Sequence, residues 1–383
     1  MPAFKSRIES ALAERKTQGL SRSMNVVFAG NQSVLEHKGR RYINFSSNDY
    51  LGLANDQALV RAWQQGLSVY GSGSGASPMV TGFSAAHSNL EAALTEWLGY
   101  DRAILFGSGF SANQALLFTL LEKSDVLIQD RLNHASLMEA GALSPAKMKR
   151  FKHNDIEHLK SLINSEDNHL VVTEGVFSMD GDCAPLSDIA AVVDSHNAWF
   201  AVDDAHGIGV LGQSGGGSCE LATVKPEILI VTFGKAFGMS GAAILCDHAT
   251  GDFLTQFARH HVYSTAMPPA QAYALTHAVS IVQEQSWRRE KLSELSEVYR
   301  DCLSDLEGFV ETQTSIKPFV IGESELALQV ASACRQNGIW VTAIRPPTVP
   351  KGTSRLRITL TANHTNEQVK TLSMALKQAL GAL

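Results

Sequence analysis

A single lysine stands among small and apolar residues near the middle of the chain, in the segment TFGKAFG at 232–238. It follows the apolar run at 228–231, which is typical of a buried strand. Burial disfavours the charged form of an amine and lowers its pKa, and a neutral amine is a nucleophile that forms Schiff bases. Lys235 is therefore the first candidate for chemistry. The alternative is a surface lysine whose stem lies along apolar groups.

Other polar residues follow neighbouring apolar strands at the point where each strand is expected to end. Glycines that lead into a helix expose backbone N–H groups, which suit an anion such as phosphate. Ligands of such sheets lie at the carboxyl ends of the strands, so we expect these residues to meet. The candidates are Gly109 and Phe110 after 102–106, His134 after 126–130, Ser178 after 169–174, Asp203 and His206 after 198–203, and Thr232 and Lys235 after 228–232.

Pyridoxal 5'-phosphate requires this combination of groups. Its aldehyde needs an amine, its ring nitrogen needs a carboxylate, and its phosphate needs backbone and hydroxyl donors. Asp203 is the expected partner of the ring nitrogen, and Asp204 should face the opposite way because side chains alternate along a strand. Taken singly, Asp203 and Ser178 could cap turns, and His134 and His206 could be ordinary polar residues. Their joint placement is what indicates a cofactor site.

Helices and apolar strands alternate between about 84 and 245, which predicts an α/β fold with a mostly parallel sheet between helices. We expect a large α/β domain at 46–290, a smaller α+β domain at 291–383, and an N-terminal helix and short strands at 1–45 that pack with the C-terminal part. Strands are expected at 102–106, 126–130, 169–174, 198–203, 228–232, 242–245 and 315–321. Helices are expected at 3–18, 56–68, 84–98, 110–121, 134–143, 155–164, 186–195, 268–305, 323–337 and 366–381.

Composition excludes several classes of protein. The net charge of −6 comes with no basic stripe, which argues against nucleic acid as a partner. No apolar run approaches the ~20 residues that a membrane span needs, and the first 19 residues have no signal-peptide pattern. The five cysteines are scattered and odd in number, which favours a reduced cytoplasmic compartment without a disulfide framework or a zinc site.

A second glycine-rich motif supports a rival function. The segment GIGVLG at 207–212 matches the dinucleotide fingerprint and follows an expected strand. The helix that this fingerprint requires is not expected, because QSGGG at 213–217 is too rich in glycine to propagate one. A nicotinamide-dependent oxidoreductase therefore stays the rival enzyme class. A pyridoxal-phosphate-binding regulator is the rival without catalysis, and no added DNA-binding segment supports it.

Over essentially its whole length the chain resembles the α-oxoamine synthases, which are fold-type I pyridoxal phosphate enzymes with an aspartate aminotransferase-like fold. The motifs are specific when taken together, and none departs from the family's pattern at a core position. The matching strings are SSNDYLGL at 46–53, NHAS at 133–136, EGVFSMDG at 174–181, VDDAHG at 202–207 and TFGKAFG at 232–238.

The resemblance implies a role for each candidate residue. Lys235, Asp203 and His134 are the implied catalytic residues: the Schiff-base lysine, the partner of the ring nitrogen and a histidine stacked on the cofactor ring. Members of the family are homodimers with active sites at the interface. The other implied contacts are His206 and Ser178 near the ring hydroxyl, Gly109, Phe110 and Thr232 at the phosphate, Thr265 at the neighbouring subunit's phosphate, Arg357 at the amino-acid carboxylate, and Arg22 and Thr348 at the acyl substrate.

The resemblance also implies the reaction, a decarboxylative condensation of an amino acid with an acyl thioester. The segments at 172–175, 263–269 and 342–350 most resemble the members that join L-alanine to pimeloyl-CoA or a pimeloyl carrier protein in biotin biosynthesis. The alternative within the family is glycine with acetyl-CoA or succinyl-CoA. The sequence does not distinguish CoA from a carrier protein as the acyl donor.

Overall fold

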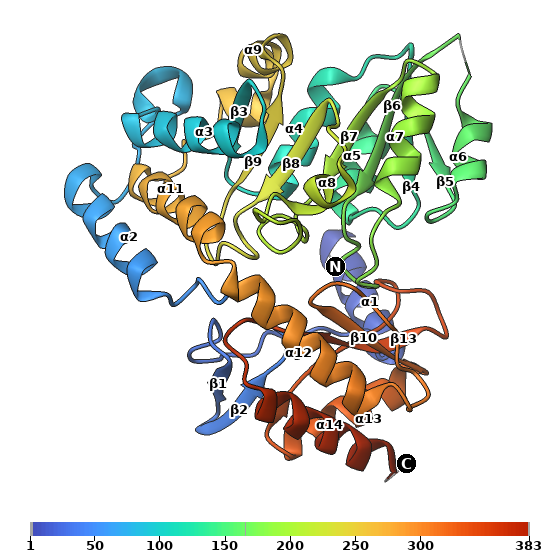
Figure 1. The fold of residues 1–383 in the computed structure, drawn as a ribbon. Helices are drawn as coiled ribbons and strands as arrows, with labels where there is room; N and C mark the ends of the chain where they lie inside the picture. The colour runs from blue at the N-terminus through green and yellow to red at the C-terminus, as the bar shows by residue number, and fades with distance from the viewer. Residues whose placement is uncertain (1–2, 165, 382–383) are drawn as a thin grey trace.

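A seven-stranded sheet forms the centre of the larger part of the molecule (Figure 1). The computed structural model describes residues 3–164 and 166–381. Strands β4 to β8 run parallel, whereas β9 is antiparallel to both of its neighbours. The strand order is β3 (Arg102–Phe106), β9 (Ala242–Cys246), β8 (Ile228–Thr232), β7 (Trp199–Asp203), β6 (Asn168–Glu174), β4 (Asp125–Asp130) and β5 (Lys147–Phe151).

Helices cover both faces of this sheet, which explains why its central strands are apolar along their whole length. Two groups of buried side chains fill the two interfaces. One face packs against α4 (Gly109–Leu120), α5 (Ala135–Leu143) and α9 (His248–Phe257), with α10 (Arg259–Val262) beside them. The other packs against α3 (Ala85–Leu98), α6 (Ile156–Leu162), α7 (Leu186–Ser195), α8 (Gly217–Ala222) and α11 (Pro269–Glu284), which itself lies beside α2 (Gln57–Tyr70).

The smaller part of the molecule contains two three-stranded sheets and lies below the large sheet in Figure 1. In one of them an N-terminal strand pairs with a strand from the C-terminal part of the chain, with Ile43 opposite Ile339. The domain boundaries at 45 and 290 stay predictions. The remaining described elements of the chain are α1 (Ala3–Thr17), β1 (Val34–His37), β2 (Arg40–Asn44), the π-helical turn at Pro78–Gly82 (which contacts α10), α12 (Trp287–Leu303), β10 (Ile316–Gly322), α13 (Ser324–Gln336), β11 (Ile339–Trp340), β12 (Thr342–Ile344), β13 (Ser354–Thr359) and α14 (Asn366–Gly381).

One expectation about a single element is wrong, and several elements, among them β5, were not expected. The helical stretch expected over 268–305 is two helices, α11 and α12, which are interrupted at Gln285 and Ser286. The strand β5 was not expected, because its sequence KMKRF lies at the edge of the sheet and has only one buried side chain. An edge strand shows no apolar run, so its sequence does not signal it.

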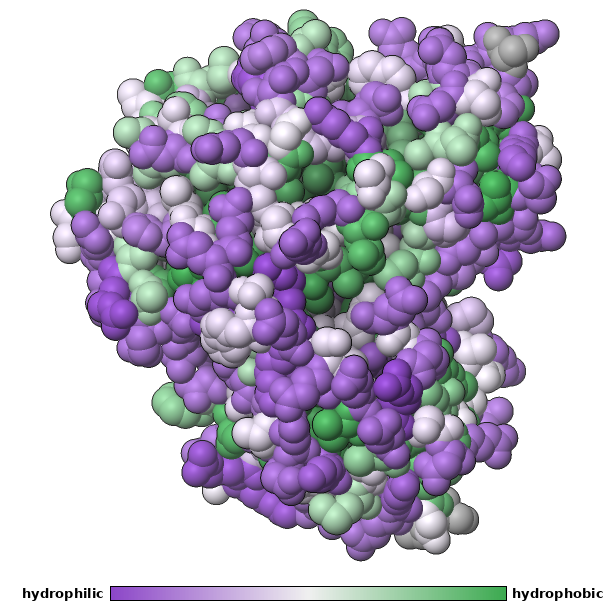
Figure 2. Space-filling model, viewed as in Figure 1, coloured by the Kyte–Doolittle hydropathy of each residue, from purple (hydrophilic) through white to green (hydrophobic). Residues whose placement is uncertain are grey.

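The face of the molecule in Figure 2 is mainly hydrophilic, and hydrophobic residues gather in the recess between the large sheet and the small sheets. Large apolar side chains are also exposed near the N-terminus, where Met24 is 98% and Val26 is 87% exposed. Within the described residues, no helix is both long and apolar enough to cross a membrane.

Candidate active site

A cavity of about 230 Å³ lies at the carboxyl ends of the parallel strands, where the sequence places the candidate residues. Lys235 is the only lysine among the described residues that line this cavity. We call it the lysine cavity. Its lining is Gly107, Ser108, Gly109, Phe110, Asn113, His134, Ser136, Glu174, Asp203, Ala205, His206, Thr232, Gly234, Lys235, Ser240 and Gly241.

The amino terminus of α4 forms one end of the lysine cavity. Ser108 caps this helix by accepting a hydrogen bond from the backbone N–H of Ser111, so that the first turn begins at Gly109. A Cβ atom at Gly109 would lie 2.6 Å from Cγ2 of Thr232, so a larger side chain does not fit there. Backbone N–H groups at a helix start and a nearby hydroxyl are the donors that a phosphate requires.

Three buried polar atoms around the lysine cavity have no hydrogen-bond partner among the described residues. They are Oδ1 of Asn113, Oε1 of Glu174 and Oγ1 of Thr232. Buried polar atoms are normally paired, and leaving one unpaired costs about 1–3 kcal/mol. Their gathering at one cavity indicates a polar ligand.

Asp203 and Asp204 point in opposite directions, as the alternation of side chains predicts. Asp203 lines the lysine cavity, where its carboxylate accepts hydrogen bonds from Nδ2 of Asn113 at 2.7 Å and from the backbone N–H of Ala205 at 3.1 Å. Asp204 is fully buried and instead accepts from the backbone N–H and the hydroxyl of Ser218. Only Asp203 is placed to meet a group inside the cavity.

Lys235 lies in a largely desolvated position. Burial lowers the pKa of its amine, and Arg357 lowers it further, while the charges of Asp203 and Glu174 oppose the shift. Nζ of Lys235 lies 3.1 Å from Nε2 of His206. Burial, together with the neighbouring Lys235, Arg357 and His134, holds the pKa of His206 well below its usual value, so this imidazole is neutral. The surface-lysine alternative is therefore excluded by the structure.

A second cavity of about 280 Å³ shares three residues with the lysine cavity: His134, His206 and Lys235. We call it the arginine cavity, because Arg357 lies in its wall. Its other lining residues are Ser46, Asn48, Ser178, Met179, Thr342 and Ile344. The two cavities therefore meet at Lys235.

Arg357 and Arg355 occupy alternate positions of β13, yet their partners differ in charge. Arg355 pairs with the carboxylate of Asp180 at 2.5 Å. Among the described residues, Arg357 donates only to neutral acceptors, namely the carbonyl of Ser178 at 2.6 Å, Oδ1 of Asn48 at 2.9 Å and the hydroxyl of Tyr50 at 3.4 Å. A guanidinium without a carboxylate among its described partners is suited to bind one from a ligand.

The ring of His134 is held in place by its own helix. Its Nδ1 accepts from the backbone N–H of Ser136 at 3.2 Å and lies 2.8 Å from the Ser136 hydroxyl, at the start of α5. Nδ1 is therefore the unprotonated nitrogen, and Nε2 carries the proton. Burial lowers the pKa of His134, so the ring is a neutral donor between the two cavities.

Three of the residues carried over from the resemblance lie outside both cavities. Arg22 and Thr348 are brought together, with Nη2 of Arg22 donating to Oγ1 of Thr348 at 3.3 Å, but neither lines a cavity. Thr265 is exposed on the surface. The nine other candidates line the cavities: Gly109, Phe110, His134, Ser178, Asp203, His206, Thr232, Lys235 and Arg357.

Sequence reasoning missed Tyr50, Asn48 and Asn113. Asn113 follows Gly109 by four positions on α4, so it lies on the same helix face and reaches Asp203. That spacing was a usable signal. Asn48 and Tyr50 lie within the string SSNDYLGL, but nothing local shows that they reach Arg357 and His206, whose positions are far away in the sequence.

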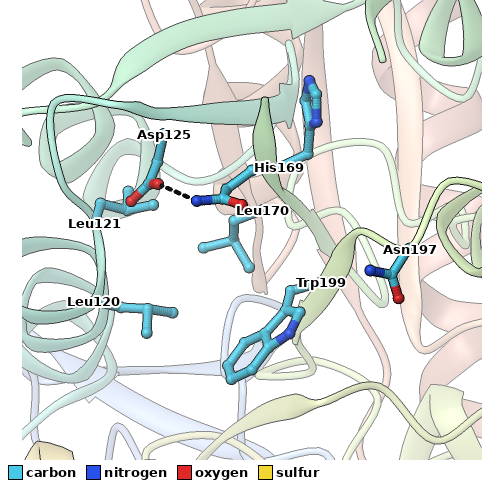
Figure 3. Close-up of a pocket in the computed structure, with 8 residues that line it drawn as sticks. Leu120, Leu121, Asp125, His169, Leu170, Asn197 and Trp199 are labelled. Atoms are coloured by element: carbon cyan, nitrogen blue, oxygen red, sulfur yellow. Dashed lines mark hydrogen bonds between the residues drawn. The ribbon is translucent and has the colours of Figure 1, made fainter. Parts of the chain in front are cut away.

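Another hollow, of about 310 Å³, lies at the opposite edge of the sheet, where β4, β6 and β7 begin (Figure 3). Leu120, Leu170 and Trp199 are among its lining residues, and a hydrogen bond of 3.2 Å joins Asn168 to Asp125. None of the candidate residues from the sequence lies there. Nine of the twelve candidate residues instead line the two cavities at Lys235.

The glycine motif at 207–212 does not form a dinucleotide site. Turns and bends occupy the residues from 205 to 215, and the next helix, α8, begins only at Gly217 and has six residues. The fingerprint needs a helix that starts within the motif. The motif instead lies beside Asp204, because a Cβ atom at Gly207 would collide with that carboxylate and with Ser218.

Comparison with known proteins identifies the family. The family model for aminotransferase class I and II matches residues 40–376. The chain is 91% identical to the 8-amino-7-oxononanoate synthase of Vibrio campbellii over 383 residues, which is the full length of both proteins. The chain belongs to the 8-amino-7-oxononanoate synthase family. Its member from Vibrio cholerae is 64% identical over 377 residues, which cover 98% of each protein. The predicted fold class and the predicted enzyme class are confirmed.

Solved structures agree with this fold. Serine palmitoyltransferase from Sphingomonas wittichii superposes with a TM-score of 0.91 at 30% identity, covering 100% of this chain and 98% of that one. The 8-amino-7-oxononanoate synthase of Francisella tularensis gives 0.79 at 29% identity, covering 89% and 98%. Two enzymes with different names thus match at similar identity. It is the sequence relatives that place the chain in the 8-amino-7-oxononanoate synthase family.

Proposed function

We propose that this chain condenses L-alanine with a pimeloyl thioester, releasing carbon dioxide and the free thiol and forming 8-amino-7-oxononanoate in biotin biosynthesis. The observation that carries the proposal is the meeting of two cavities at Lys235, one fitted to a phosphorylated cofactor and one to a carboxylate. Family membership supports the same reaction. Pimeloyl-CoA and a pimeloyl carrier protein are both retained as donors.

Pyridoxal 5'-phosphate is the cofactor that this family implies, and the lysine cavity fits it. The start of α4 and the hydroxyl of Thr232 would hold the phosphate, Asp203 the ring nitrogen and Lys235 the aldehyde. The unpaired oxygen of Thr232 and the absence of a Cβ at Gly109 are what a phosphate at this end requires. When bound, the cofactor supplies an electron sink for the α-carbon of an amino acid.

Arg357 would bind the carboxylate of L-alanine. Its guanidinium has neutral acceptors for partners, so a carboxylate gains a charge-assisted pair there without displacing another one. Lys235 lines both cavities. An amino acid whose carboxylate is bound by Arg357 would therefore have its α-carbon close to the amine of Lys235. Orientation of this kind makes the proton transfer effectively unimolecular.

Lys235 would then accept the α-proton of the amino acid, and His134 would stabilise the charge on the thioester carbonyl. The lowered pKa of Lys235 makes its neutral amine available as the base that takes the α-proton. His134 lines both cavities, and the proton on its Nε2 would polarise the carbonyl of the acyl thioester. Arg22 and Thr348 would contact the acyl chain, as the family resemblance implies.

An assay of carbon dioxide release tests this function. The purified protein, loaded with pyridoxal phosphate, is supplied with pimeloyl-CoA and either L-alanine or glycine. We expect release with L-alanine and at least about tenfold less with glycine, since a methyl group in an apolar subsite discriminates by about 10–200-fold. Glycine turnover with acetyl-CoA or succinyl-CoA, and none with L-alanine, would assign the chain to the alternative reaction.

We also propose that the chain forms a homodimer in which Thr265 reaches the partner's phosphate site. Thr265 and Tyr263 lie on the segment that leads from α10 to α11. Thr265 is exposed, and Tyr263 is 80% exposed. Val80, in the π-helical turn that contacts α10, is 74% exposed. Large apolar side chains exposed together are typical of a surface that a second protein covers.

Sedimentation equilibrium and one variant test this dimer. We expect a mass of twice 41.4 kDa. Thr265→Ala should raise the dissociation constant of pyridoxal phosphate about tenfold to 100-fold, because one hydrogen bond to a charged group is lost. Ser264→Ala, a change at the adjacent exposed residue, is the control and should leave it unchanged. A monomer, or equal effects of the two changes, would contradict the proposal.

We place the reaction in the cytoplasm. All five cysteines are free thiols in the structure: Cys183, Cys219, Cys246, Cys302 and Cys334. Free thiols persist in a reducing compartment.

A further inference from the structure

Tyr50 lies between Arg357 and His206. Its side chain is buried, with 1% of its surface exposed. Its hydroxyl lies 2.7 Å from Nδ1 of His206, 3.3 Å from Oδ1 of Asn48 and 3.4 Å from Nη2 of Arg357. The other ring nitrogen of His206 faces Lys235. Tyr50 therefore joins Arg357 to Lys235 through one imidazole.

The donors and acceptors around this hydroxyl determine where its proton lies. Arg357 has no acceptor atom, so it donates to the oxygen of Tyr50. Asn48 already accepts from Nη1 of Arg357 at 2.9 Å, and its contact with Tyr50 is the longer one. Nδ1 of His206 is the nearer acceptor. The hydroxyl proton of Tyr50 is thus best placed on the bond to Nδ1.

A donor at Nδ1 fixes the other nitrogen as well. The charged and titratable groups around His206 and Lys235 are Arg357, His134, Asp203 and Glu174. Complete burial lowers the pKa of His206 most, and the neighbouring Lys235, Arg357 and His134 lower it further, so His206 does not take a second proton. A neutral imidazole that accepts at Nδ1 carries its proton at Nε2.

We propose that Tyr50 is a positioning residue that fixes His206 as the Nε2–H tautomer, so that this imidazole donates a hydrogen bond into the lysine cavity. The inference rests on the proposed function only in that the acceptor in the cavity is the ring hydroxyl oxygen of pyridoxal phosphate. In the protein without cofactor, the same Nε2–H group faces Nζ of Lys235 at 3.1 Å, and it donates to that nitrogen when Lys235 is the neutral amine. The tautomer is a property of this chain alone and is measurable without the cofactor.

Nitrogen NMR of the full-length, cofactor-free protein labelled with ¹⁵N-histidine tests the inference. The signals of His206 are assigned by their loss in His206→Gln. In the wild type we expect one tautomer, with Nδ1 unprotonated and Nε2 protonated. In Tyr50→Phe we expect a measurable fraction protonated at Nδ1, and a rise in the dissociation constant of pyridoxal phosphate of about fivefold to tenfold, since a hydrogen bond is lost.

Tyr299→Phe is the matched control, because Tyr299 is also 1% exposed and its hydroxyl has no hydrogen-bond partner among the described residues. It should change neither the tautomer nor the affinity. A wild-type His206 protonated at Nδ1 overturns the inference, as does a Tyr50→Phe variant with the wild-type tautomer. If the wild type binds no pyridoxal phosphate, the proposed function fails, while the tautomer of the cofactor-free protein still decides the inference on Tyr50.

Discussion

Lys235→Ala is expected to abolish turnover while leaving the protein folded. The rate of carbon dioxide release should fall by roughly 10³-fold or more, because general base catalysis contributes up to about 10⁴-fold and the covalent link to the cofactor is lost as well. No other described residue of the lysine cavity carries an amine that could replace it. Removing a buried amine takes away a group that is costly to desolvate, so the stability of the fold should not suffer.

Two measurements separate this loss from unfolding. Borohydride treatment should attach the cofactor permanently to the wild type and not to Lys235→Ala, while equilibrium dialysis should still detect non-covalent binding through the start of α4, Thr232 and Asp203. Lys123→Ala is the control, because Lys123 is exposed in the turn before β4, at the other edge of the sheet. Multiple turnovers by Lys235→Ala at the wild-type rate would remove Lys235 from the chemistry.

Much of the large domain was predictable because each layer leaves a local signal. The strand β8 reads ILIVT and is buried at every position, so its apolar run marks it directly. The interruption at Gln285 and Ser286 was not predictable, since neither glycine nor proline marks it. Just beyond the interruption, Arg288 pairs with Asp56 at 2.7 Å, a residue far away in the sequence. Such a contact leaves no trace in either local sequence.

Some features of the site were predictable from the sequence and others were not. Residues at strand ends, such as Asp203 and Lys235, were predictable because parallel strands bring their carboxyl ends to one edge. The charge environment of Arg357 was not. It depends on Asn48 and Tyr50, which are 309 and 307 positions away, and on the carbonyl of Ser178. The sequence shows which groups are present at the edge of the sheet, and only the structure shows which charges are left without a partner.

Asp203→Asn is expected to slow turnover by about 10²-fold to 10³-fold while cofactor binding persists. The carboxylate accepts hydrogen bonds from Asn113 and from the N–H of Ala205, and a protonated ring nitrogen would be a third donor. An asparagine keeps the shape of the side chain but removes the negative charge that stabilises the protonated ring nitrogen of the cofactor. Its amide NH₂ group would also replace one acceptor oxygen and would face a hydrogen-bond donor. The electron sink is weakened, whereas the phosphate contacts at the start of α4 are unchanged.

Asp204→Asn is the matched control for this change. Asp204 is the adjacent residue, is fully buried and also accepts two hydrogen bonds, but they come from Ser218 on the other side of the strand. Its replacement should lower the free energy of unfolding by about 1–3 kcal/mol and leave kcat of the folded enzyme near the wild-type value. If Asp203→Asn kept full activity, or if both variants lost activity equally, the assignment of the ring-nitrogen partner to Asp203 would be wrong. A large kcat effect at Asp203 alone would show what determines which of the two aspartates takes part in the reaction. It would be the side of the strand toward which the carboxylate points, and not the burial of a carboxylate.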